Sequence, residues 1–170
     1  MTVADEIADH LAAEGITHAF GIIGGGNVTL WDAIAKKIEI VCCHHEQAAA
    51  QAGTYYYRTC GRLAPVIITS GAGSANAITG VMAANMDSIP LLVLAGNEKL
   101  SDLVGKTRIL GLQGYDSAAL ARGFTKWSQT CWTAGEALPL LKKGIEKAIT
   151  PRQGAVWITI PRDIQGAVAV

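Results

Sequence analysis

Residues 41–53 read VCCHHEQAAAQAG, and this stretch decides which fold the chain is expected to form. The mostly apolar run over residues 38–43 leads into two histidines, and Glu46 then opens an alanine-rich segment, which predicts a strand that runs directly into a helix. Glu46 is therefore expected at the carboxyl end of a strand. Ligands bind at that edge of open α/β sheets, and a carboxylate in the first turn of a helix interacts favourably with the helix dipole. The position predicts that Glu46 acts on a ligand.

The rest of the chain alternates apolar runs with helical patterns. Thr2, with Asp5 three positions later, is expected to cap the first helix. Continuously apolar runs indicate strands buried on both faces, and hence a parallel sheet covered by helices. We predict one doubly wound α/β domain over residues 1–170, with three α/β/α layers and a mostly parallel six-stranded sheet. Strands are expected over residues 17–23, 38–43, 65–70, 89–95, 125–130 and 155–160. Helices are expected over residues 2–15, 46–59, 117–122 and 134–149, and after the glycine turns at residues 24–26 and 71–73.

The composition is typical of a single domain, and the formal net charge of the chain is zero. The chain has 170 residues, half of them hydrophobic, which is enough to bury one full core. Lysine plus arginine equal aspartate plus glutamate at 14 each, which argues against nucleic acid or an anionic membrane as a partner. Charged residues make up only 16%, against roughly 25% in typical soluble domains. Part of the surface is therefore expected to face another protein.

The cysteines and the first residues indicate a reduced, cytoplasmic setting. The four cysteines have no C-x-x-C spacing, and the sequence opens with a helical pattern rather than a basic and apolar leader. No apolar run reaches the about 18 residues of a membrane span. Consecutive strand residues alternate faces, so Cys42, Cys43, His44 and His45 cannot converge on one ion, and no metal site is predicted.

Three turns at the ends of the first three predicted strands are expected to line one crevice. They carry Gly24-Gly25-Gly26, Glu46, and the segment 71–76, GAGSAN. Small residues at two of these turns let a flat ligand approach the backbone closely. Segment 71–76 also permits a simple packing interpretation or a dinucleotide site, although the third glycine of the dinucleotide fingerprint is replaced by Asn76.

Four motifs in this order resemble the pyrimidine-binding (PYR) domain of thiamine-diphosphate enzymes, most closely the acetohydroxyacid (acetolactate) synthase group. Residues 19–25, AFGIIGG, are similar to V-F-G-Y-P-G-G, and residues 45–49, HEQAA, to H-E-Q-G-A. Residues 69–76, TSGAGSAN, are similar to T-S-G-P-G-A-T-N, and residues 86–91, MDSIPL, contain D-S-I-P. The resemblance extends from about residue 3 to residue 164.

The resemblance implies a catalytic role for Glu46. In the family the matching glutamate hydrogen-bonds N1′ of the aminopyrimidine, which favours the imino tautomer whose exocyclic nitrogen takes the thiazolium proton. The residues implied in cofactor binding are Ile23, Gly24, Glu46, Ala72 and Asn76. Those implied on the substrate side are Gly25, Gln113 and Lys126.

Departures from the family pattern predict an altered substrate pocket. Ile23 and Ala72 stand where the family has proline, and residues 112–114, LQG, lack the phenylalanine and the acid of its F-Q-E loop. The pocket is therefore expected to differ from that of an acetolactate former.

The resemblance also implies a partner. Full-length members hold Mg²⁺ through a G-D-G and a later asparagine in a diphosphate-binding (PP) domain, and this sequence has no G-D-G. The sequence begins with Met1, and residues 161–164, PRDI, stand where the family has P-K-D-V. We expect a stand-alone PYR subunit whose PP-domain partner holds the diphosphate and Mg²⁺, in a heterotetramer of two of each chain.

The expected reaction is decarboxylation of a 2-oxo acid such as pyruvate, with ligation of the resulting carbanion to an acceptor carbonyl. Three alternatives stay open: a 2-oxo acid decarboxylase subunit of the sulfopyruvate or phosphonopyruvate type, a non-catalytic PYR-like binding module, and a dinucleotide binder. Exchange of Glu46 for glutamine distinguishes the catalytic hypotheses from the non-catalytic one, because only catalysis requires the carboxylic acid.

Overall fold

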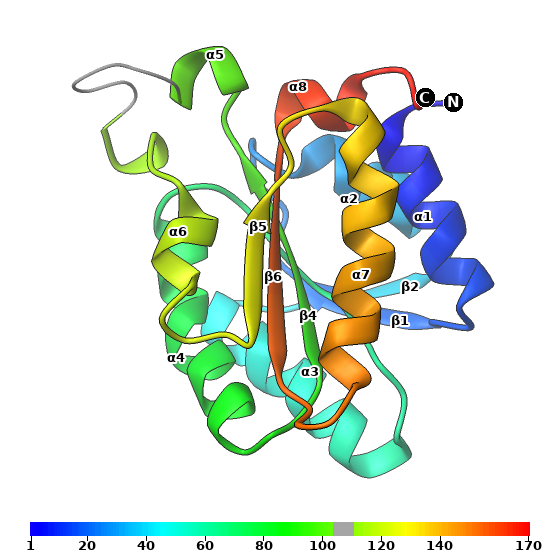
Figure 1. Cartoon of the computed structure of the whole chain (residues 1–170), viewed down its shortest axis with the longest axis vertical. Coiled ribbons are helices and arrows are strands. Elements are labelled where there is room, and N and C mark those ends of the chain that lie inside the picture. Colours follow the sequence, from blue (N-terminus) through cyan, green and yellow to red (C-terminus); the bar gives the residue numbers. More distant parts are fainter. Residues whose placement is uncertain (104–110) are drawn as a thin grey trace.

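The computed structural model describes residues 1–103 and 111–170. In these residues six parallel strands form one sheet in the order β2-β1-β3-β4-β6-β5 (Figure 1). This arrangement confirms the predicted α/β class. The strands are β1 (His18–Gly21), β2 (Glu39–Cys42), β3 (Val66–Ile68), β4 (Leu91–Asn97), β5 (Trp127–Thr130) and β6 (Ala155–Pro161).

Helices cover both faces of the sheet, which makes the three layers visible in Figure 1. Core residues of α1, α2 and α7 pack on one face, and those of α3, α4 and α6 pack on the other. The long helices are α1 (Val3–Ala13), α2 (Val28–Ala35), α3 (Glu46–Cys60), α4 (Ala72–Met86) and α7 (Ala137–Ile149). The short ones are α5 (Leu100–Leu103), η1 (Gly111–Gln113), α6 (Ser117–Ala121), η2 (Ala134–Glu136) and α8 (Arg162–Gly166).

The central strands are buried on both faces, as their apolar runs predict. In β4, Leu92 and Leu94 join the core under α1, α2 and α7, whereas Leu91 and Val93 join the core under α3 and α4. The prediction of a strand buried on both faces is wrong for β2, whose residues, EIVC, are mostly exposed. The physical reason is that β2 lies at the edge of the sheet and has only one neighbouring strand.

Several predicted boundaries are adjusted. Thr2 and Asp5 form the expected capping box at the start of α1. The first strand ends at Gly21, earlier than predicted, and the helix expected over residues 134–149 begins as the separate 3-10 turn η2. The sequence did not predict α8. Within the described ranges, no helix has the length and apolar character needed to cross a membrane.

Close backbone contacts fix the turns at the carboxyl edge of the sheet. A Cβ atom at Gly96, near the end of β4, would lie 2.0 Å from the carbonyl oxygen of Gly26, so a glycine is needed where the two backbones touch. The buried Gln165 of α8 donates to Gly26 O at 2.7 Å and accepts from the Leu30 amide at 3.1 Å. The glycine turn after β1 is therefore held by both β4 and α8.

Helices α3 and α4 pack closely side by side. A Cβ atom at Gly80 of α4 would lie 2.7 Å from the Cβ of Ala50 of α3. Small residues at this contact let the two helix axes approach. Because both helices begin at the carboxyl edge of the sheet, their first turns lie close together.

Candidate functional site

Glu46 and Asn76 meet at the carboxyl edge of the sheet. Glu46 begins α3 shortly after β2 ends, and only 8% of its surface is exposed. His45 caps this helix end, because its Nδ1 atom accepts from the Gln47 amide at 3.2 Å. Asn76, in the second turn of α4, donates from Nδ2 to Glu46 Oε2 at 3.0 Å. The structure thus joins two residues that lie thirty positions apart in the chain.

Gly73 leaves space for the carboxyl group of Glu46. A Cβ atom at Gly73 would lie 3.0 Å from Glu46 Oε1 and 2.7 Å from Cγ2 of Thr69. Gly71, which precedes α4, has φ +67°, a conformation that favours glycine. These two glycines explain why the turn after β3 accepts few side chains.

The turn after β1 is fixed by Asn27, a residue that the sequence analysis did not single out. Asn27 is fully buried, accepts from the Gly24 amide at 2.7 Å and donates to Ile22 O at 3.0 Å. The Gly26 amide donates to Thr69 Oγ1 at 3.1 Å, which joins this turn to the turn after β3. An asparagine directly after three glycines was the signal that could have identified it.

The other predicted site residues divide between the two edges of the sheet. Ile23 is exposed to 52% on the turn after β1. A Cβ atom at Gly24 would lie 2.6 Å from Thr69 Oγ1, so Gly24 lies near the turn after β3. Gln113 lies against that turn, because a Cβ atom at Gly71 would lie 3.0 Å from its Cγ. Ala72, the first residue of α4, and Gly25 are exposed at the same edge.

The structure does not bring Lys126 to this edge. Lys126 directly precedes β5, at the amino end of the sheet, and its ammonium group donates to Lys147 O at 2.6 Å and Thr150 O at 2.7 Å. These carbonyl groups belong to the carboxyl end of α7, which a cation stabilises. Its expected place on the substrate side is therefore not supported, and its contacts indicate a structural role.

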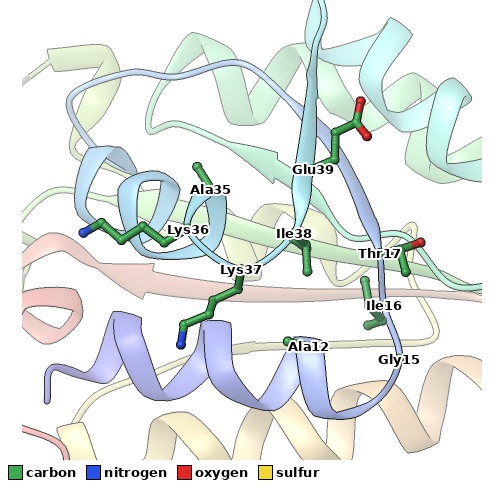
Figure 2. Close-up of a pocket in the computed structure, with 9 residues that line it drawn as sticks. All are labelled: Ala12, Gly15, Ile16, Thr17, Ala35, Lys36, Lys37, Ile38 and Glu39. Atoms are coloured by element: carbon green, nitrogen blue, oxygen red, sulfur yellow. The ribbon is translucent and has the colours of Figure 1, made fainter.

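An open pocket of about 540 Å³ lies at this amino edge, between the loops that lead into β1 and β2 (Figure 2). Its two lysines are both paired: Lys36 with Asp32 at 2.6 Å and Lys37 with Asp9 at 2.7 Å. Figure 2 shows the side chains of Lys36, Lys37 and Glu39 diverging from one another. The pocket therefore lacks the convergent polar groups of a ligand site.

Comparison with known proteins identifies the family. The family model described as thiamine pyrophosphate enzyme, N-terminal TPP binding domain, matches residues 1–121. The chain belongs to the thiamine pyrophosphate enzyme family. This membership confirms the resemblance to the PYR domain.

Acetolactate synthases are among the relatives of this thiamine pyrophosphate enzyme domain. The large subunit from Haemophilus influenzae is 35% identical over 162 residues, which are 94% of this chain and 28% of that protein. The isozyme 3 large subunit from Escherichia coli is 34% identical over 163 residues, 95% of this chain and 28% of that protein. The chain thus spans less than a third of the length of these relatives.

A solved structure of the family supports the fold. The thiamine diphosphate-dependent 4-hydroxybenzoylformate decarboxylase of Rhodococcus jostii RHA1 superposes with a TM-score of 0.92 at 25% identity. The match covers all of this chain and 32% of that one. In the described part of the chain, no group of three or more histidine, cysteine, aspartate or glutamate side chains could hold a metal ion.

Proposed function

We propose that this chain is the PYR component of a thiamine-diphosphate-dependent enzyme that removes CO₂ from a 2-oxo acid such as pyruvate and joins the remaining acyl fragment to an acceptor carbonyl. The observation that carries the proposal is the pair of Glu46 and Asn76 beside Gly73, at the sheet edge where α/β proteins bind ligands. The relatives named acetolactate synthase support the reaction type.

The residues at this edge fit the aminopyrimidine ring of thiamine diphosphate. Glu46 is proposed to hold a proton at N1′ of the ring, because a mostly buried carboxyl group can exchange a hydrogen bond with a ring nitrogen. Asn76 holds Oε2 of Glu46, and Gly73 keeps the space beside Oε1 free of side-chain atoms. When bound, thiamine diphosphate supplies the electron sink for the loss of CO₂. This chain positions the aminopyrimidine ring and holds a proton at its N1′ atom.

The neighbouring turns are proposed to orient the ring. Ile23 and Gly24 would face the ring from the turn after β1, and Ala72 from the start of α4. Exposed Ile23 offers an apolar surface for a flat ring to pack on. Gly25 and Gln113 are proposed on the substrate side, and Gln113 lies against Gly71.

We further propose a PP-domain partner that binds the diphosphate and Mg²⁺, in a heterotetramer of two of each chain. A face of α3 and α4 that begins beside Glu46 supports this proposal. Its exposed residues near Glu46 are uncharged and include Ala48, Gln51 and Tyr55 of α3 and Ala75, Thr79, Ala83 and Met86 of α4. At the far end of the face the exposed Arg58 and Asp87 form an ion pair at 3.6 Å. Depletion of charge is typical of the centre of a protein interface. The partner would close the site from this side.

Exchange of Glu46 for glutamine tests the proposed function. With the partner subunit, thiamine diphosphate, Mg²⁺ and pyruvate, we expect Glu46→Gln to lower the rate of CO₂ release by at least about 100-fold. Glu39→Gln is the matched control, because Glu39 is an exposed acid at the start of β2 and pairs with His18. Unchanged turnover by Glu46→Gln would contradict the proposal, and full turnover by the isolated chain would contradict the need for a partner.

A decarboxylase is the second candidate, because the Rhodococcus jostii structure that superposes at a TM-score of 0.92 is a decarboxylase. The two candidates differ in the fate of the acyl fragment. Product analysis with pyruvate and an added aldehyde separates them: a ligase yields a hydroxyketone, whereas a decarboxylase yields acetaldehyde and leaves the added aldehyde unconsumed.

A further inference from the structure

Tyr115 connects the segment before α6 to the turn that begins α4. Its hydroxyl group donates to the carbonyl oxygen of Gly71 at 2.8 Å. The same carbonyl accepts the Ala75 amide at 3.1 Å, the first hydrogen bond of α4. A tyrosine phenol is protonated at neutral pH, and burial raises the pKa of Tyr115 further. Tyr115 thus contacts the helix end that carries Gly73 and Asn76.

Asn97 provides a second anchor for the same segment. It is 1% exposed, ends β4, and donates from Nδ2 to the carbonyl oxygen of Tyr115 at 3.1 Å. Its Oδ1 atom accepts the Glu98 amide at 2.9 Å, so both ends of the Asn97 amide group are bonded. The main chain of Tyr115 is therefore tied to the end of β4, and its side chain to the turn that begins α4.

Gln113 lies against the same turn. A Cβ atom at Gly71 would lie 3.0 Å from Gln113 Cγ, 3.2 Å from Gln113 Cα and 3.2 Å from Leu112 O. The segment is thus in direct contact with the turn, although both Leu112 and Gln113 are exposed. Contacts of exposed residues alone do not hold a segment in place, whereas hydrogen bonds to a partly buried tyrosine do.

We propose that Tyr115 is a positioning residue that pins Gln113 on the Gly71 turn and thereby sets the contact of Gln113 with the 2-oxo acid. The inference rests on the proposed function. It adds a residue that positions the substrate-binding side chain rather than one that binds the cofactor. Tyr115 acts through Gln113 and does not itself touch the reacting atoms.

Amide hydrogen exchange of the isolated chain tests the anchor without any turnover. Tyr115→Phe keeps the ring and removes only the hydroxyl, so we expect amides of residues 112–116 to exchange about fivefold faster. Tyr57→Phe is the matched control, because it removes a hydroxyl that accepts from Gln153 Nε2 at 3.2 Å, far along α3 from this turn. Equal exchange in residues 112–116 of Tyr115→Phe and wild type would overturn the anchor.

A double-mutant cycle with the partner subunit tests whether Tyr115 acts through Gln113. With pyruvate as the probe, we expect Tyr115→Phe to raise KM about fivefold and to leave kcat within twofold, since a lost positioning contact weakens binding of substrate and transition state alike. The double variant with Gln113→Ala should be no worse than Gln113→Ala alone. Effects that multiply would overturn the coupling.

The two proposals fail in different ways. If Glu46→Gln retains full turnover, the proposed function fails, whatever Tyr115→Phe does. If Glu46→Gln abolishes turnover and the cycle is additive, only the role of Tyr115 is overturned. If pyruvate is not converted by the wild type, hydrogen exchange of residues 112–116 still decides whether the Tyr115 hydroxyl holds the segment.

Discussion

At the scale of single residues, the centre of the site is the carboxyl group of Glu46, with the Asn76 amide that donates to it and with Gly73, which has no side chain to fill the space beside it. Asn76 bonds one oxygen at 3.0 Å, and Gly73 keeps free the space beside the other. The position of the Glu46 carboxyl group is therefore sensitive to a single atom added at a neighbouring residue. Groups that are packed at van der Waals distance cannot make room for such an atom unless the backbone moves.

Gly73→Ala should therefore disturb Glu46 even though alanine favours a helix. The added methyl group would lie 2.7 Å from Thr69 Cγ2 and 3.0 Å from Glu46 Oε1. We expect turnover with the partner to fall about tenfold and the free energy of unfolding to fall by about 1 kcal/mol, as the overpacking outweighs the gain in helix propensity. Gly123→Ala is the control, since nothing lies within 4 Å of its added Cβ. Wild-type turnover by Gly73→Ala would show that the space beside Oε1 is not needed.

Cys131 gives a pH-dependent prediction at the residue scale. It is fully buried, and burial, together with the charge of Glu136, raises the pKa of its thiol from 9.0 to about 12. Between these values the unfolded chain loses the proton while the folded chain keeps it, so the free energy of unfolding falls as pH rises above 9. Urea unfolding at pH 8 and pH 10 should show a smaller loss of stability in Cys131→Ala than in wild type. Equal losses would contradict the assignment to Cys131.

At the scale of elements, the ends of helices and strands decide which residues reach the site. Parallel strands place all their carboxyl ends at one edge, so Glu46, the turn at Gly24 and the turn at Gly71 converge. Lys126 comes before its strand rather than after it and therefore lies at the other edge. Its three hydrogen bonds, to Lys147 O, Thr150 O and Thr150 Oγ1, stabilise the end of α7.

Lys126→Met is expected to lower the free energy of unfolding by about 1 kcal/mol and to leave catalysis unaltered, because it removes a cation from the carboxyl end of α7. Lys142→Met, at an exposed lysine of the same helix, should change stability by less than about 0.5 kcal/mol. Both values can be measured by urea denaturation, and turnover by the assay with the partner. A large rise in KM for the 2-oxo acid in Lys126→Met would return this residue to the substrate side.

At the scale of the molecule, the two chain ends pair with each other, and the C-terminal helix α8 contacts the glycine turn of the site. Thr2 and Val168 form an isolated antiparallel bridge, and Figure 1 shows the two termini side by side. Gln165 of α8 bonds Gly26 O and Ile160 O, each at 2.7 Å. The last helix therefore holds the first glycine turn against the end of β6.

Gln165→Leu should destabilise the whole domain. The substitution leaves the carbonyl groups of Gly26 and Ile160 and the amide of Leu30 without the side chain that bonds them, in a buried setting. We expect the free energy of unfolding to fall by about 3 kcal/mol, with one cooperative transition. Gln129→Leu, on the exposed side of β5, is the control. A loss below about 0.5 kcal/mol would show that α8 does not hold the turn.

The sequence by itself determined the fold class, the capping box at Thr2 and the place of Glu46 after β2, because each depends on periodicity or on residues a few positions apart. It also carried the motifs that identify the family. Tertiary structure decided the rest. The bond from Asn76 to Glu46, the Tyr115 anchor and the exposure of β2 all depend on which elements are neighbours in space. Local patterns cannot specify that, since a strand becomes a central or an edge strand only when the sheet order is set.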